Sequence, residues 1–147
     1  MNSSDLQVSL HPQSHESVRQ DHSSELAEDY VEAIQQIKVQ KRSPRITDLQ
    51  NVFGVSHVTV IRTLKRLEDQ GLVSRSRKDG ICLTATGAKL AKQSAERHQL
   101  VFAFLKKLGV SETQAQIDAE GLEHHFSKES LAALQNFLKG NSYNSIQ

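Results

Sequence analysis

Residues 46–84, ITDLQNVFGVSHVTVIRTLKRLEDQGLVSRSRKDGICLT, decide the fold of this chain. Residues 46–53 have the apolar spacing of a short helix that ends at Gly54. A second amphipathic helix is predicted from about His57 to Gln70, and Gly71 ends it. Two helices joined by a short turn that contains a glycine are typical of a helix-turn-helix.

The segment after Gly71 predicts a β-hairpin. Residues 72–77 alternate with period two, Lys78-Asp79-Gly80 supplies an Asp-Gly turn, and residues 81–84 form the return strand. A helix-turn-helix followed directly by a basic hairpin is a winged helix. Such a module places its second helix in the major groove, so we expect DNA contacts from this helix and the hairpin. The candidate DNA-binding residues are His57, Val58, Thr59, Arg62, Thr63, Lys65, Arg66, Arg75, Arg77 and Lys78.

The charge of the chain is unevenly distributed. The whole sequence carries a formal net charge of only +1, yet residues 38–78 hold ten basic against three acidic side chains. A basic segment inside a nearly neutral chain favours binding to a polyanion. A winged helix that binds protein is the alternative, and it is disfavoured because the basic residues concentrate on the two elements that would face DNA.

The flanking sequence predicts further helices. One begins at Ser24, a long one runs from Thr86 to about Leu108, another opens at Ser111, and a last one follows Ser127. The predicted fold class is mainly α with a small β-hairpin wing: an N-terminal winged helix-turn-helix followed by an all-helical domain. The predicted divisions are a disordered extension at 1–24, the winged helix at 25–85, the helical domain at 86–139 and a flexible tail at 140–147.

Composition excludes several classes of protein. No run of 18 or more apolar residues exists, and residues 1–24 lack the layout of a signal peptide, so a cytoplasmic protein with no membrane partner is expected. The single cysteine, Cys82, excludes an internal disulfide and a cysteine-based zinc cluster within one chain. Any bound metal must therefore be held by oxygen and nitrogen.

Residues 118–125, Asp-Ala-Glu-Gly-Leu-Glu-His-His, combine three carboxylates with two imidazoles. If this stretch is helical, Glu120, Glu123 and His124 lie at i, i+3 and i+4 on one face. Like charges one turn apart repel unless a cation lies between them. Carboxylates with neutral imidazoles suit Mn²⁺ or Fe²⁺.

Three ligands from one helix leave a metal ion incompletely coordinated. The other candidates are His98, which lies in an otherwise apolar helix, and Asp29 with Glu32 on the first helix. The alternatives are that His98 is a satisfied core residue and that the two acids form a solvated helical turn. His125 points about 100° away from His124 on an ideal helix and is expected to lie outside the set of ligands.

Several motifs, taken together in order, resemble the manganese-responsive regulators of the diphtheria-toxin-repressor family, over residues 25–139. These are Glu-Asp-Tyr-Val-Glu (28–32), Gly-Val-Ser-x-x-Thr-Val (54–60), Leu-Lys-Arg-Leu (64–67), Leu-Thr-Ala-Thr-Gly (83–87), Glu-Arg-His (96–98) and residues 118–125. The resemblance implies a homodimeric repressor of operator DNA, with a winged helix, a helical dimerisation domain and a two-metal site between them. The implied metal ligands are Asp29, Glu32, His98, Glu120, Glu123 and His124.

One departure within the family bears on the metal. Iron-responsive relatives carry a Met and a Cys among the ligands, whereas this chain has Asp29 and Glu120 at the matching places. The resemblance therefore implies Mn²⁺, two ions per subunit, with Fe²⁺ as the alternative. The competing functions are an iron-responsive or small-ligand regulator and a di-metal carboxylate enzyme. The enzyme is disfavoured because the chain has only one comparable cluster and a winged helix without catalytic use, so neither catalysis nor a small-molecule substrate is expected.

Overall fold

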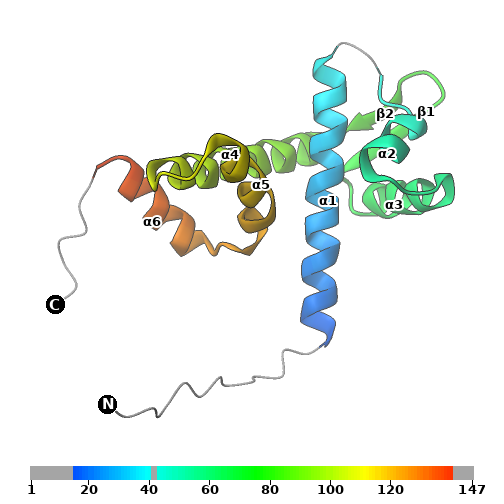
Figure 1. Cartoon of the computed structure of the whole chain (residues 1–147). Helices are drawn as coiled ribbons and strands as arrows, with labels where there is room; N and C mark the ends of the chain where they lie inside the picture. Colours follow the sequence, from blue (N-terminus) through cyan, green and yellow to red (C-terminus); the bar gives the residue numbers. More distant parts are fainter. Residues whose placement is uncertain (1–14, 41–42, 141–147) are drawn as a thin grey trace.

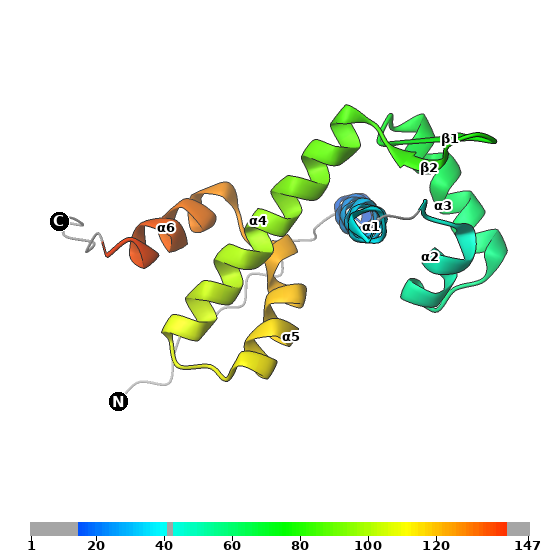
Figure 2. The same cartoon turned by 90° about the horizontal axis from the view of Figure 1, so that it is seen from above.

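The computed structural model describes residues 15–40 and 43–140, and it is mainly helical with one two-stranded sheet (Figure 1). Helix α1 (His15–Val39) is the longest element. Figure 2 shows this helix end-on, with α2 (Ile46–Phe53) and α3 (His57–Asp69) on one side and α5 (Glu112–Leu122) and most of α4 (Ala85–Lys107) on the other. The predicted fold class, mainly α with a β-hairpin wing after a helix-turn-helix, is confirmed.

The helix-turn-helix consists of α2 (Ile46–Phe53) and α3 (His57–Asp69). Gly54 between them has a φ of 62°, a conformation that costs glycine little. The hairpin pairs β1 (Val73–Ser76) with β2 (Gly80–Leu83) in antiparallel fashion, as the Asp-Gly turn predicts. These four elements form the winged helix.

One hydrophobic core joins the winged helix to α1. Tyr30 of α1 stacks on Phe53 of α2, with ring centroids 4.2 Å apart. The start of α4 packs so closely on the hairpin that a Cβ at Gly87 would lie 2.0 Å from the Leu72 carbonyl oxygen. The buried residues of this core also include Val31, Ile34, Leu49, Val60, Leu64, Leu67, Val73, Ile81 and Ala91.

A second core holds the C-terminal helices together. It joins the end of α4 (Ala85–Lys107) to α5 (Glu112–Leu122) and α6 (Lys128–Leu138). Helix α4 contributes Ala91 to the first core and Val101 to the second, so it spans both units. The predicted division between residues 85 and 86 therefore falls at the first residue of a helix that both units share, and the domain limits stay a prediction.

Three details differ from the expectations. Helix α1 begins at His15, not at Ser24, and residues 15–23 include no Gly or Pro that would end a helix. Residues 15–24, which were expected to be disordered, are thus helical, and residues 1–14 lie outside the described part, as do residues 141–147 of the predicted tail. The acidic stretch is α-helical only to Leu122, and residues Glu123–His125 form the 3₁₀ turn η1. In the described residues, no helix is long and apolar enough to cross a membrane.

Candidate metal centre

The face of α3 predicted to read DNA is open to solvent. Ser56 caps this helix by accepting a hydrogen bond from the Thr59 backbone N–H, which fixes the N-terminal turn. All the candidate DNA-binding side chains but one are exposed: His57, Val58, Thr59, Arg62, Lys65, Arg66, Arg75, Arg77 and Lys78. Thr63 is the exception and a correction, because it is buried and its hydroxyl donates to the Thr59 carbonyl oxygen at 3.0 Å.

Two of the candidate DNA-binding residues already have acidic partners. Arg75 donates to Glu68 at 2.6 Å, which ties the wing to the end of α3, and Lys65 lies 2.8 Å from Asp69. Exposed pairs of this kind contribute little to stability, so phosphate can compete for both cations.

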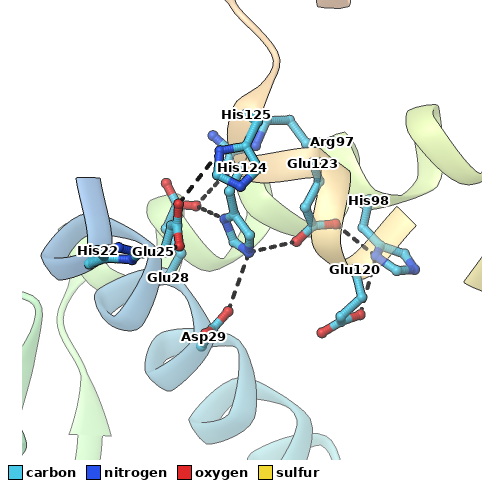
Figure 3. A network of polar contacts seen from close by, with 10 residues as sticks. All are labelled: His22, Glu25, Glu28, Asp29, Arg97, His98, Glu120, Glu123, His124 and His125. Carbon is cyan, nitrogen blue, oxygen red and sulfur yellow. Dashed lines mark hydrogen bonds and ion pairs between the residues drawn. The ribbon is translucent and has the colours of Figure 1, made fainter. Parts of the chain in front are cut away.

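The candidate metal ligands converge where α1, α4, α5 and η1 meet (Figure 3). Nδ1 of His98, on α4, lies 2.7 Å from Glu123 Oε2 and 3.5 Å from Glu120 Oε2. Nε2 of His124 lies 3.4 Å from Asp29 Oδ1 and 3.5 Å from Glu123 Oε1. Five of the six side chains are therefore linked by contacts of 3.5 Å or less.

Glu123 is the centre of this cluster. Its side chain is 2% exposed, and its two oxygens face different imidazoles, those of His98 and His124. Burial raises the pKa of Glu123 to about 7. Bonds to Asp29 and Glu28 raise the pKa of His124 to about 10. Without metal, protons therefore occupy part of this cluster at neutral pH.

The sixth candidate, Glu32, lacks a hydrogen-bond partner at one oxygen. Its Oε1 atom is buried and has no partner within hydrogen-bonding geometry among the described residues, although the Ser94 hydroxyl lies near this carboxylate. Burial raises the pKa of Glu32, Ser94 lowers it, and the carboxylates of Glu120 and Asp29 raise it further. The same three acids line a hollow of about 230 Å³ whose wall includes Phe53 of α2. Glu32 is half-buried, and a carboxylate that is partly desolvated and faces other carboxylates is destabilised.

The donor set fits a divalent cation that prefers oxygen and imidazole nitrogen. In the described part of the chain, no group of three or more such donors is arranged as a ready cage for an ion, and the donors bond to one another instead. The unpaired oxygen of Glu32 is the feature that a cation would satisfy. His125 is exposed and lies 3.8 Å from Glu25, away from the cluster.

Three residues that contact the candidate ligands, directly or through one another, were not predicted as site residues from the sequence. Glu28 accepts from His124 Nδ1 at 2.8 Å and pairs with Arg97, while Gln116 lies 2.8 Å from His98 Nε2. Glu28 and Arg97 each precede a candidate ligand in the motifs at 28–32 and 96–98, which was a usable signal. Gln116 lies in a polar stretch of α5, where no sequence signal indicates that it would contact His98.

Fold and site together define a winged-helix DNA-binding protein whose reading module is joined to a helical unit through a cluster of carboxylates and imidazoles. The family models agree. The model "Iron dependent repressor, N-terminal DNA binding domain" matches residues 22–81, and "Iron dependent repressor, metal binding and dimerisation domain" matches residues 84–144.

Relatives support the same family. "Transcriptional regulator MntR" of Escherichia coli O6:H1 is 44% identical over 132 residues, which cover 90% of this chain and 85% of the relative. "HTH-type transcriptional regulator MntR" of Bacillus subtilis is 32% identical over 104 residues, 71% and 73% of the two chains. The chain belongs to the iron-dependent repressor family, within its MntR-type transcriptional regulators. It is therefore a DNA-binding regulator with a metal-binding and dimerisation domain.

Solved structures share the fold. The structure titled "Manganese-dependent transcriptional repressor complex with manganese" is 30% identical with a TM-score of 0.66, and it covers 79% of this chain. "Structure of the manganese regulator SloR" is 27% identical with a TM-score of 0.68 and covers 77%. This chain spans about half the length of each, 53% in both cases.

Proposed function

We propose that the protein is a manganese-responsive repressor of manganese-uptake genes, in which metal binding between the two domains orders a homodimer for operator binding. The MntR relatives and the manganese-bound structure support this function. It would act in the cytoplasm, without catalysis, a membrane partner or a small-molecule substrate.

The observation that carries the proposal is the division of the six candidate ligands between two structural units. Asp29 and Glu32 come from α1, which packs in the core of the winged helix, whereas the other four come from α4, α5 and η1. Glu32 presents a buried oxygen with no partner among the described residues. A site divided in this way links metal occupancy to the position of the DNA-reading module.

Two ions per subunit are consistent with the geometry. Glu123 directs one oxygen to His98 and the other to His124, so it is suited to bridge two ions. Glu120 and Glu32, which both lie near His98, would complete the ion there, and Asp29 would complete the ion near His124. The absence of Met and Cys from these six residues favours Mn²⁺ over softer ions, with Fe²⁺ as the alternative.

The residues suggest how the signal is transmitted. A divalent ion held by these residues would supply positive charge to four carboxylates, two of which, Glu32 and Glu123, have a pKa raised in part by neighbouring carboxylates. Asp29 and Glu32 then attract the C-terminal unit instead of repelling Glu120. Helix α1 carries this change to α2 and α3 through Tyr30 and Phe53. Reciprocal coupling requires operator DNA to tighten metal binding by the same factor.

The test is a DNA-binding titration with Mn²⁺, Fe²⁺ and Zn²⁺ in parallel. A duplex is first selected from a random pool by the Mn²⁺-loaded protein, and its affinity is then measured with each metal and without metal. We expect Mn²⁺ to raise the affinity by about tenfold or more, within the usual range of allosteric coupling. Equal affinity without metal would instead support a regulator that does not respond to metal.

A matched pair of variants on α5 tests the ligand assignment. Glu120→Gln removes a candidate ligand from an exposed position, and Glu112→Gln removes a carboxylate from the first turn of the same helix, away from the cluster. Glu120→Gln should lose most of the manganese response while staying folded and dimeric, and Glu112→Gln should keep it. A full response in Glu120→Gln would show that the assignment is wrong.

A further inference from the structure

The carboxylate of Glu28 lies between the imidazole of His124 and the guanidinium of Arg97. It contacts His124 on the side of the ring that faces away from the candidate ligands. Its Oε2 atom accepts a hydrogen bond from His124 Nδ1 at 2.8 Å and also pairs with the Arg97 guanidinium. Glu28 is buried, and the three residues come from α1, η1 and α4 (Figure 3). Three elements thus meet at one carboxylate oxygen.

This contact determines which nitrogen of His124 is available. Because Nδ1 donates its proton to Glu28, Nε2 is the nitrogen that faces Asp29 at 3.4 Å and Glu123 at 3.5 Å. A ring held at one nitrogen has a defined orientation for the other, and carboxylates commonly play this part behind metal-bound histidines.

The ion pair with Arg97 explains why Glu28 supports the imidazole of His124 and is not itself a candidate ligand. Arg97, on α4, pairs with the same Glu28 oxygen that accepts from His124, so the carboxylate is held toward α4 and away from the candidate ligands. Adjacent residues of α1 then have different partners: Glu28 bonds Nδ1 of His124, and Asp29 faces Nε2.

We propose that Glu28, held by Arg97, is a positioning residue that aims Nε2 of His124 at the metal. This inference rests on the proposed function, since it assigns a supporting role within the same centre. Glu28 itself does not bind the ion. Its contribution is to fix the orientation of one ligand before metal arrives.

The experiment compares the Mn²⁺ affinity of four full-length variants with that of the unaltered protein by isothermal titration calorimetry. Glu28→Ala removes the hydrogen-bond partner of His124 Nδ1, and Glu28→Gln keeps an acceptor there without the negative charge. Arg97→Gln keeps Glu28 but removes the guanidinium that pairs with it. Glu25→Ala is the matched control, because Glu25 lies one turn earlier on α1 and contacts His22 and His125 instead.

Loss of the Nδ1 partner should lower Mn²⁺ affinity by about ten- to hundredfold in Glu28→Ala, the usual effect of removing such a partner. Glu28→Gln and Arg97→Gln should each lose less, and Glu25→Ala should bind like the unaltered protein. If Glu28→Ala unfolds, as circular dichroism would reveal, Glu28→Gln and Arg97→Gln still test the inference. Unaltered affinity in every folded variant would overturn it.

A second measurement separates positioning from a merely structural role. In protein loaded with diamagnetic Zn²⁺, nitrogen NMR of the imidazoles should show His124 bound to metal through Nε2 and a slowly exchanging proton on Nδ1. In Glu28→Gln that proton should exchange faster. Coordination through Nδ1 in the unaltered protein would refute the inference, whereas failure of the unaltered protein to bind Mn²⁺ would refute the proposed function itself.

Discussion

The affinity for manganese should rise steeply with pH, because protons occupy two of the candidate ligands in the metal-free protein. The pKa of His124 is raised to about 10 and that of Glu123 to about 7. A metal ion needs Nε2 of His124 and the oxygens of Glu123 without protons, so binding must release them. Affinity therefore increases as pH rises, the direction that competition between a metal and protons requires.

The two pKa values set the size of the effect. At pH 7.5 His124 carries its proton and Glu123 is partly protonated, so binding should release between about one and two protons per subunit. At pH 6.5 a larger share of Glu123 is protonated, and the release should rise toward about two. Affinity should then fall by more than about tenfold from pH 7.5 to pH 6.5.

Calorimetry in buffers with different ionisation enthalpies measures this proton release directly. Titrations with Mn²⁺ at pH 6.5, 7.0 and 7.5 in two such buffers give the number of protons at each pH. A release close to zero at pH 7.5, or an affinity that does not change over this range, would refute the assignment of His124 and Glu123 as ligands. A release that does not increase toward pH 6.5 would exclude Glu123 alone.

Three further predictions concern stability and DNA. Glu32→Gln should stabilise the metal-free protein by about 1 kcal/mol, because it removes a buried charge with an unpaired oxygen, yet it should abolish the stabilisation by Mn²⁺ in thermal unfolding. Gly87→Ala should lower the free energy of unfolding in urea by about 3 kcal/mol, since its Cβ would lie 2.0 Å from the Leu72 carbonyl oxygen. Gly121→Ala is the control and should stabilise the protein slightly, because the space around Gly121 is open. Arg62→Ala should weaken operator binding by about 1–3 kcal/mol in fluorescence anisotropy, and Arg75→Ala by less, because Arg75 already pairs with an acid.

Much of the fold could be predicted because local signals agree with the tertiary structure. Ser56, Ser111 and Ser127 each cap a helix as the sequence indicates, and Gly54 ends α2 in the left-handed conformation. The N-terminal part of α1 was missed because its helix has no apolar stripe. Sequence periodicity reports the face that a helix buries, so a polar helical extension gives no such signal.

The candidate site was less predictable. The six residues could be gathered because acids and histidines at helical spacing stand out and because the family resemblance orders them. Which nitrogen of each imidazole faces the centre could not be predicted, since it depends on Glu28 and Gln116, which lie on other elements. The burial of Thr63 was missed because its polar side chain suggested a DNA contact, whereas its spacing from Val60 and Leu67 places it on the buried face of α3.

The contacts around Glu28 also refine how metal would act. Arg97 and His124 both bond to Glu28, so these contacts join α1 to the C-terminal unit. Further along α1, Glu32 and Asp29 share their hollow with Phe53 of α2. Because Phe53 stacks on Tyr30 of α1, a metal ion that drew Glu32 toward Glu120 would act on the helix-turn-helix through direct packing. A small rotation of α1 about the Glu28 contact is the motion that this arrangement favours.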